Sequence, residues 1–208
     1  IPADAGFSEV ELIFTTLAGC TSQVDQLVNV LPSPLVSLEV PITCLGELTV
    51  PSASIDDNGA GGIDTYAWFF GDNTTSSQAS PQHLYTSAQT YFMELQVTGV
   101  NGCYAIADAT AEVIEPPVAD FTVTNACLDT PYLLISASTA GTDAIALWDW
   151  EVETLGEVQG EVAEVTFDDT GFFEVNLEVI SENGCSDEVT AQVPVFELPS
   201  PDFSFTPA

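Results

Sequence analysis

The stretch Phe173–Val179 reads Phe-Glu-Val-Asn-Leu-Glu-Val, and the turn Asn183-Gly184-Cys185 follows it. Apolar and polar residues alternate with a period of two, which is typical of a β-strand that buries one face and solvates the other. Asn-Gly favours a tight hairpin turn, because both central positions of that turn need a positive φ. The stretch therefore predicts an antiparallel hairpin. Ala163–Phe167 predicts another half-buried strand, and Leu48–Val50 is a shorter example with Thr49 at its centre.

The hairpin pattern occurs three times in the chain. A related strand precedes a Gly-Cys pair at Cys20, Cys103 and Cys185, which follow one another at steps of 83 and 82 residues. Cys44 and Cys127 are also 83 residues apart, and a proline-containing junction ends each copy. A fixed period of this size indicates a tandem array of repeats.

The repeat sets the expected domain organisation of the 208 residues. About 83 residues with about seven short strands predict an immunoglobulin-like β-sandwich, so the chain is expected to be all-β. Short junctions that contain proline favour repeats stacked end to end. The sequence reads as a window cut from a longer array, with these parts: the C-terminal part of a preceding repeat (1–34), two whole repeats (35–117 and 118–200), and the first strand of a following repeat (201–208).

Charge excludes several classes of function. The chain has no Lys or Arg and 32 acidic residues, which give a formal net charge of −32. Nothing in it can neutralise phosphate, so a nucleic-acid partner is excluded and docking on anionic lipid is disfavoured. Hydrophobic residues nevertheless make up 46% of the chain, which predicts a folded core rather than an acidic disordered tail. No apolar run reaches the length of about 18 residues that a membrane span needs.

One segment carries a family resemblance. Tyr66–Asn73 reads Tyr-Ala-Trp-Phe-Phe-Gly-Asp-Asn and resembles the Trp-Asp-Phe-Gly-Asp-Gly signature of polycystic kidney disease (PKD) domains. His83-Leu84-Tyr85 and the following Thr90-Tyr91 resemble the same family's His-x-Tyr and Thr-Tyr segments. The repeat 118–200 is a degenerate copy, which keeps Trp148-Asp149-Trp150 but has Glu151-Val152 where Gly-Asp would stand.

The resemblance implies an extracellular β-sandwich. Tandem PKD-like repeats with paired cysteines resemble giant surface adhesins of Bacteroidetes, including gliding-motility adhesins. We therefore expect a structural stalk segment of a cell-surface adhesin or filament that projects a distal binding region. Two alternatives remain open: a module that itself binds surface polysaccharide or other cells, and a spacer in a secreted hydrolase.

The resemblance also assigns roles to aromatic residues. It places Trp68 and Trp148 at the family's core tryptophan position, and Trp150 where the family has a core phenylalanine. His83 is the only histidine, and the second repeat has Val165 at the same place, so we interpret His83 as structural. A catalytic triad would need a nucleophile and an acid grouped around it, and nothing else in the sequence points to one, so we expect no enzyme activity.

Five cysteines in an exported β-protein indicate disulfides. The simplest scheme pairs cysteines within repeats, as Cys44–Cys103 and Cys127–Cys185, and leaves Cys20 for a partner upstream. In an immunoglobulin-like sandwich, however, Cys44 and Cys103 would lie at opposite ends, about 23 Å apart, whereas a disulfide needs Cα atoms within about 7 Å. The staggered alternative pairs Cys44 with Cys185 and leaves Cys20, Cys103 and Cys127 to bond with neighbouring repeats.

The loop 54–64 contains three carboxylates, one amide and several glycines. Hard oxygen ligands in a flexible loop suit Ca²⁺, and some PKD domains bind calcium in this region. The predicted ligands are Asp56, Asp57, Asn58 and Asp64. The alternative is an ordinary solvated loop, and no other cofactor is expected.

Overall fold

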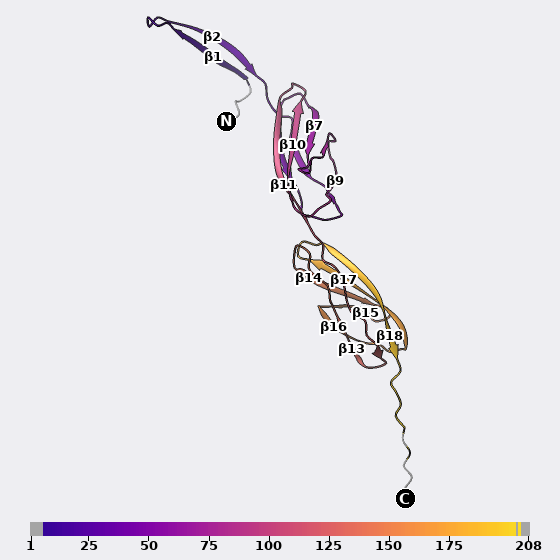
Figure 1. The fold of residues 1–208 in the computed structure, drawn as a ribbon. Coiled ribbons are helices and arrows are strands. Elements are labelled where there is room, and N and C mark those ends of the chain that lie inside the picture. Colours follow the sequence, from indigo (N-terminus) through magenta and orange to yellow (C-terminus); the bar gives the residue numbers. More distant parts are fainter. Residues whose placement is uncertain (1–5, 203, 205–208) are drawn as a thin grey trace. The chain divides into compact units, whose positions relative to one another are not determined.

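A computed structural model describes residues 6–202 and 204 of the chain. Every regular element in this part is a β-strand (Figure 1). The all-β prediction is therefore confirmed, and the topology is that of antiparallel sandwiches. Of the fourth predicted segment, 201–208, the residues 203 and 205–208 lie outside the described part, and 201, 202 and 204 are not in a strand.

A two-stranded hairpin opens the described chain. It pairs β1 (Gly6–Thr15) with β2 (Thr21–Val30) along their whole length. Its residues are exposed except for the half-buried Val30.

The first whole repeat is a sandwich of two layers. One layer is a five-stranded sheet in the order β4-β11-β10-β7-β8, in which β4 runs parallel to β11 and the other neighbours are antiparallel. The other layer consists of the pairs β3–β6 and β5–β9. The strands are β3 (Leu35–Glu39), β4 (Thr43–Cys44), β5 (Leu48–Thr49), β6 (Ser52–Asp56), β7 (Ile63–Phe69), β8 (Thr75–Ser76), β9 (His83–Leu84), β10 (Thr90–Gly99) and β11 (Tyr104–Ile114).

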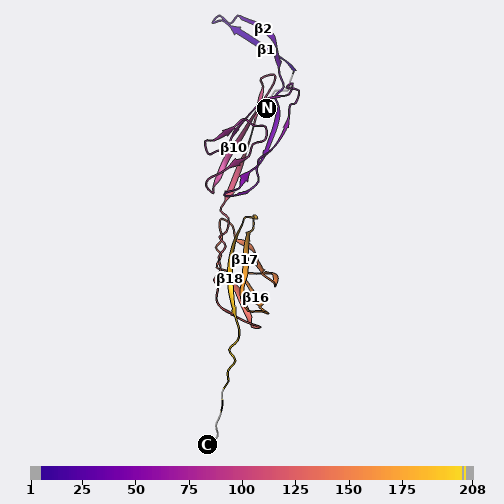
Figure 2. The ribbon, with the colours of Figure 1, turned by 90° about the vertical axis from the view of Figure 1, so that its right-hand side faces the viewer.

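The second repeat has the same plan. Its five-stranded sheet runs β12-β18-β17-β14-β15, again with a parallel first pair, and the pair β13–β16 forms the other layer. Figure 2 shows β16, β17 and β18 from a second direction. The strands are β12 (Ala126–Cys127), β13 (Pro131–Ile135), β14 (Ile145–Val152), β15 (Gly156–Gln159), β16 (Val162–Thr166), β17 (Gly171–Ser181) and β18 (Ser186–Phe196).

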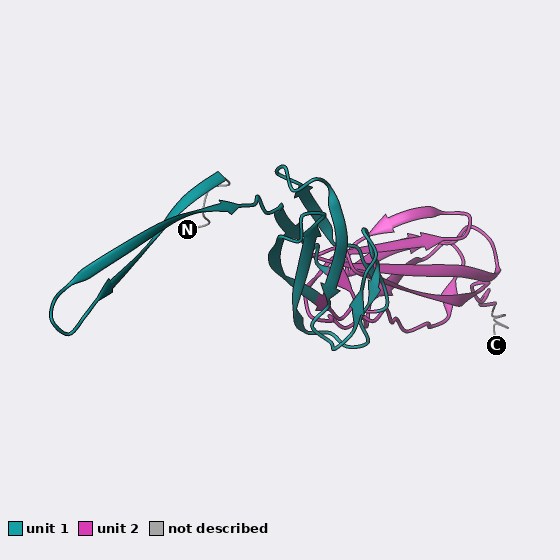
Figure 3. Ribbon diagram, turned by 90° about the horizontal axis from the view of Figure 1, so that it is seen from above, with its two compact units in different colours: residues 1–42, 46–112 teal, residues 43–45, 113–208 magenta. Residues whose placement is uncertain are grey.

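The described chain divides into two compact units, coloured in Figure 3. Unit 1 contains residues 1–42 and 46–112, and unit 2 contains residues 43–45 and 113–208. The short strand β4 therefore belongs with unit 2, although in the sequence it stands near the start of the first repeat.

Alternation of apolar residues builds both cores. On β10 the side chains of Met93, Leu95 and Val97 are fully buried, and on β17 those of Val175, Leu177 and Val179 are too. Each strand presents polar or partly exposed residues on its other face. The strand predicted over 163–167 is β16, and its alternate residues also lie in the core. The prediction fails in part at Leu48–Val50, where Thr49 is buried and its two apolar neighbours are exposed.

Candidate structural site: the disulfide and the repeat junctions

A disulfide joins Cys44 to Cys185, with the Cα atoms 5.6 Å apart. Cys44 ends β4, which pairs in parallel with the last residues of β11, opposite Ile114. The N–H of Leu45 continues this ladder by donating to the Ile114 carbonyl at 2.8 Å. Cys185 closes the turn between β17 and β18 and is 1% exposed. The bond therefore links one sequence repeat to the next, and it is the bond that the staggered scheme predicts.

The parallel pairing explains why Cys44 does not bond within its own repeat. Cys44 lies beside Ile114 at the end of β11, whereas Cys103 immediately precedes β11 at its other end. Eleven residues of extended strand separate the two ends by roughly 36 Å. A disulfide cannot bridge that distance. In this structure Cys20, Cys103 and Cys127 are free thiols.

The junction that follows β11 is held by hydrogen bonds from a loop of unit 2. The N–H of Glu115 donates to Thr142 Oγ1 at 2.8 Å, and the N–H of Thr142 donates to the Glu115 carbonyl at 3.1 Å. Gly141 permits this approach, since a Cβ there would lie 2.1 Å from the Glu115 carbonyl oxygen and 2.3 Å from that of Pro116. The loop therefore fixes the backbone of the junction at Glu115, through both its N–H and its carbonyl.

The junction that follows β2 is held by two asparagines of unit 1. Asn101 Nδ2 donates to the Pro32 carbonyl at 2.7 Å, and Asn58 Nδ2 donates to the Ser33 carbonyl at 3.1 Å. Asn101 belongs to the Asn-Gly-Cys turn, which the sequence indicated only as a hairpin signal. None of these contacts with the junctions was predicted, because no local sequence pattern indicates which carbonyl a side-chain amide will reach.

The predicted calcium ligands do not converge. Asp56 Oδ1 accepts the N–H of Asn58 at 2.8 Å, and Asp57 accepts the N–H groups of Gly59 (3.3 Å) and Gly62 (2.8 Å). The carboxylates thus satisfy the loop's own backbone, while Asp64 is exposed on β7. Within residues 6–202 and 204, no three His, Cys, Asp or Glu side chains lie close enough together to hold a metal. The calcium prediction gains no support from this geometry.

The tryptophan prediction needs a correction. Trp68 lies opposite Leu95, and Trp150 lies opposite the equivalent Leu177. Both are fully buried, and each donates its indole N–H to a loop carbonyl, at 2.8 Å for Trp68 and 2.9 Å for Trp150. Trp150 is therefore the counterpart of Trp68, whereas Trp148 is only partly buried at the margin of the core. The prediction aligned Trp148 with Trp68, so its alignment of this strand is wrong by two residues, which is one period of a β-strand.

His83 has a structural environment. Its ring stacks on Phe70 with centroids 4.1 Å apart, and its Nε2 lies 2.7 Å from Asp72 Oδ2. Burial raises the pKa of Asp72, but hydrogen bonds from Thr74 and His83 outweigh it, so the net pKa is lowered. Burial, together with nearby negative charge, raises the pKa of Tyr85 to about 12, and its hydroxyl donates to the Phe70 carbonyl at 2.8 Å. These contacts hold the loop that contains Gly71 and Asp72 against the core.

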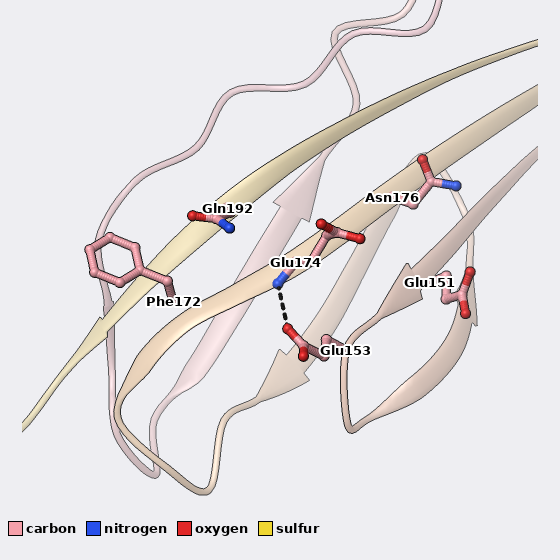
Figure 4. A pocket seen from close by; sticks show the side chains of 6 residues that line it. All are labelled: Glu151, Glu153, Phe172, Glu174, Asn176 and Gln192. Atoms are coloured by element: carbon pink, nitrogen blue, oxygen red, sulfur yellow. Dashed lines mark hydrogen bonds between the residues drawn. The ribbon is translucent and has the colours of Figure 1, made fainter.

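A shallow hollow lies on the outward sheet face of unit 2, and Figure 4 shows the residues that line it. Three of them are glutamates, and the N–H of Glu174 donates to Glu153 Oε2 at 3.2 Å. The carboxylates come from β14, the turn after it and β17. The lining residues are Glu151, Glu153, Phe172, Glu174, Asn176 and Gln192.

In the described chain no helix has the length and hydrophobicity that crossing a membrane requires.

Comparison with known proteins agrees with the first-repeat motifs. A curated relative, the pre-pro-metalloprotease PrtV of Vibrio cholerae, is 27% identical over 147 residues, which are 70% of this chain and 16% of the relative. The chain thus spans less than a fifth of that protein's length.

Two solved structures also show similarity to parts of this chain. A Ca²⁺-stabilised adhesin, by which an Antarctic bacterium reaches out and binds ice, has a TM-score of 0.50 at 12% identity, over 90% of this chain and 56% of the adhesin chain. The PKD1 domain of Vibrio cholerae PrtV is 29% identical over 39% of this chain and 98% of that domain, with a TM-score of 0.37. Residues 32–113, which include the Trp68 and His83 segments, match the family model of the PKD domain.

Proposed function

We propose that this chain is a stalk segment of a long extracellular adhesin or surface filament and that its role is mechanical and not catalytic. The observation that carries the proposal is the Cys44–Cys185 disulfide, because it bonds one repeat covalently to the next. A covalent bond between repeats carries load when the chain is under tension, which is what a stalk requires.

The junction contacts support the same role. The junctions between repeats are the points where few contacts cross and a tandem array would bend or be cut. Here the backbone is pinned at two of the junctions, by Thr142 at Glu115 in unit 2 and by Asn101 at Pro32 in unit 1. The chain also offers trypsin-like proteases no cleavage site, because it has no Lys or Arg. Both properties suit a thread that is exposed to the medium.

The expected location is outside the cell, on its surface. Disulfides persist in oxidising compartments, and a chain with 32 acidic residues and no basic ones is soluble and self-repelling in saline media. The partners are neighbouring repeats of the same protein, with surface polysaccharide or other cells at the distal end of the parent. No sequence-specific nucleic-acid role fits this charge.

Immunogold electron microscopy of intact cells tests the proposal, with an antibody raised against residues 118–200. We expect label at intervals along surface threads that extend from the cell. An antibody from pre-immune serum is the control. Label confined to the medium, with bare cells, would contradict the stalk.

The second candidate is a spacer in a secreted protease. The observation that favours it is the relative PrtV, a pre-pro-metalloprotease that aligns with 70% of this chain. In that case the immunogold label is released into the medium, and an immunoprecipitate made with the same antibody digests casein. A surface thread without proteolytic activity would exclude this candidate.

A further inference from the structure

The hairpin β1–β2 is a third copy of the hairpins that complete the two sandwiches. When the three Gly-Cys pairs are aligned, the strand registers coincide at Val10↔Gln26, Met93↔Ala109 and Val175↔Ala191. The residue four positions before each cysteine donates its N–H to the cysteine carbonyl: Thr16 to Cys20 (2.9 Å), Gly99 to Cys103 (2.8 Å) and Ser181 to Cys185 (2.8 Å).

The core face of this third hairpin is uncovered. Val10, Leu12 and Phe14 are 53%, 51% and 63% exposed. Their counterparts on β10, Met93 and Leu95 among them, are 0% exposed. An apolar face of this size is unstable in water unless other strands cover it.

The edge of the hairpin also lacks a neighbour that its two copies have. β11 pairs in parallel with a short strand whose Cys44 lies opposite Ile114, and β18 pairs likewise with a strand whose Cys127 lies opposite Phe196. The residue that aligns with Ile114 and Phe196 after β2 is Leu31. Among the described residues, β2 pairs only with β1.

Cys103 is positioned for the strand that would occupy this edge. The disulfide of Cys185 is made to Cys44, the residue beside Ile114. Cys103 is the counterpart of Cys185, and its Sγ lies 3.9 Å from the carbonyl oxygen of Leu31, the counterpart of Ile114. We propose that Cys103 forms a disulfide with a cysteine on a strand that pairs in parallel with the chain at Leu31, and that this strand belongs to the repeat completed by β1 and β2.

The same rule assigns the other free thiols. Cys127 is the counterpart of Cys44. The N–H of Leu128 donates to the Phe196 carbonyl at 2.9 Å, just as the N–H of Leu45 donates to the Ile114 carbonyl. By this rule Cys127 bonds to the cysteine of a Gly-Cys turn further along the parent chain. Cys20 is a Gly-Cys turn cysteine and bonds to an earlier strand. Each bond forms when two thiols lose two protons and two electrons to a disulfide oxidant, which is reduced to two thiols.

Staggered bonds of this kind enclose overlapping loops. The Cys44–Cys185 loop has a sequence separation of 141 residues and contains both Cys103 and Cys127. The proposed disulfide of Cys103 closes a loop that ends at Cys103, and that of Cys127 closes a loop that begins at Cys127. Each of these two loops therefore overlaps the Cys44–Cys185 loop. Tension along the parent chain would pass from loop to loop through disulfides, without extending most strands. This inference rests on the tandem-repeat part of the proposed function and not on the surface location.

The test extends the full chain with its own sequence. Gly6 aligns with Gly171, so residues 118–165 are fused in front of Ile1 and supply the strands that β1 and β2 lack, with a second copy of Cys127. After oxidation with oxidised glutathione, a glutamyl endopeptidase releases the five native cysteines in separate peptides, because Glu residues lie between all of them. Mass spectrometry without reduction then identifies the linked pairs.

We expect a peptide that joins Cys103 to the copied Cys127, alongside the Cys44–Cys185 peptide. Amide exchange in β1 should slow by about tenfold or more, because its core face becomes covered. The control carries Cys127→Ser in the fused copy only, and it should leave Cys103 alkylatable. Cys103 that stays free, or that bonds to Cys20, while Cys44–Cys185 is formed would overturn the proposal.

A second chain keeps the test decisive if the hybrid repeat does not fold. It joins residues 118–199 to residues 35–208, so that the leading repeat is whole and Pro199 takes the place of Pro34 directly before Leu35. The expected peptide is again Cys103 linked to the leading Cys127, and a free Cys103 overturns the inference. Neither outcome depends on where the parent protein is found, so failure here is distinguishable from a negative immunogold result.

Discussion

The Cys44–Cys185 disulfide should limit how far the chain extends under force. The perturbation is Cys44→Ser, made in a background where Cys20, Cys103 and Cys127 are also Ser so that no other disulfide forms. With the bond intact, a force applied to the two termini passes from residue 44 directly to residue 185, and the strands between them cannot straighten.

The structure gives the magnitude. The bond spans a sequence separation of 141 residues, and its Cα atoms are 5.6 Å apart. An extended chain covers about 3.5 Å per residue, so the bond hides about 490 Å of contour length. The variant should therefore reach a fully extended length that is about 490 Å greater than that of the oxidised parent.

Single-molecule force spectroscopy with tags at both termini measures this length. Reduction of the parent by dithiothreitol should reproduce the length of the variant, and the variant itself should not respond to dithiothreitol. If the oxidised parent and Cys44→Ser extend equally, the disulfide does not carry the load and the mechanical reasoning is wrong.

Three further outcomes are expected. Trp150→Ala should lower the free energy of unfolding by about 3–5 kcal/mol in urea titration, because the side chain is 0% exposed, whereas Phe172→Ala on the exposed face should change it by less than about 0.5 kcal/mol. Hydrogen bonds from Thr74 and His83 lower the pKa of Asp72 in the folded state, so Asp72→Asn should destabilise the protein above about pH 4. The difference in unfolding free energy between variant and parent should fade as pH falls through the folded-state pKa, and a difference that grows on acidification would contradict this. The melting temperature should rise between 20 mM and 1 M NaCl, because salt screens the repulsion between carboxylates that no basic residue neutralises. A melting temperature that falls with salt would contradict this argument. A further rise with CaCl₂ at matched ionic strength would support the calcium prediction.

The strand pattern was predictable because the repeat shows it three times. Alternation identified the buried residues of β16 and β17, and the Gly-Cys spacing identified the turns. Leu48–Val50 failed because two residues of strand carry too little periodicity to decide which face is buried, and the surrounding sandwich decides it for Thr49.

The tryptophan assignment failed for a different reason. Trp148 and Trp150 stand on the same face of one strand, so the sequence alone offers two registers that differ by two residues. Pairing with β17 selects Trp150, because its neighbour Leu177 is the counterpart of Leu95, which faces Trp68. Strand pairing is a long-range property, and a motif read in isolation does not contain it.

Part of the candidate site was accessible from topology. The order of strands in a sandwich was enough to predict that Cys44 and Cys103 lie at opposite ends of the first repeat. The structure places them so, because β4 pairs in parallel with the end of β11. The contacts of Asn101, Asn58 and Thr142 were not accessible, because each depends on how a loop folds against a junction. Asn101 shows the limit most clearly, since the Asn-Gly signal explains its turn and says nothing of its bond to Pro32.

The composition explains why these junctions use the bonds that they do. A chain without Lys or Arg cannot form the usual ion pairs, and in the described residues the single ion-pair contact is between His83 and Asp72. Adjacent repeats that are both strongly negative repel one another, most of all at low salt. What remains to hold a junction is a covalent bond and hydrogen bonds from neutral groups, and the structure uses Cys44–Cys185 and the side chains of Asn101 and Thr142. Of these, the disulfide is indifferent to both charge and ionic strength, so it is the element on which a mechanical role in variable saline surroundings would depend.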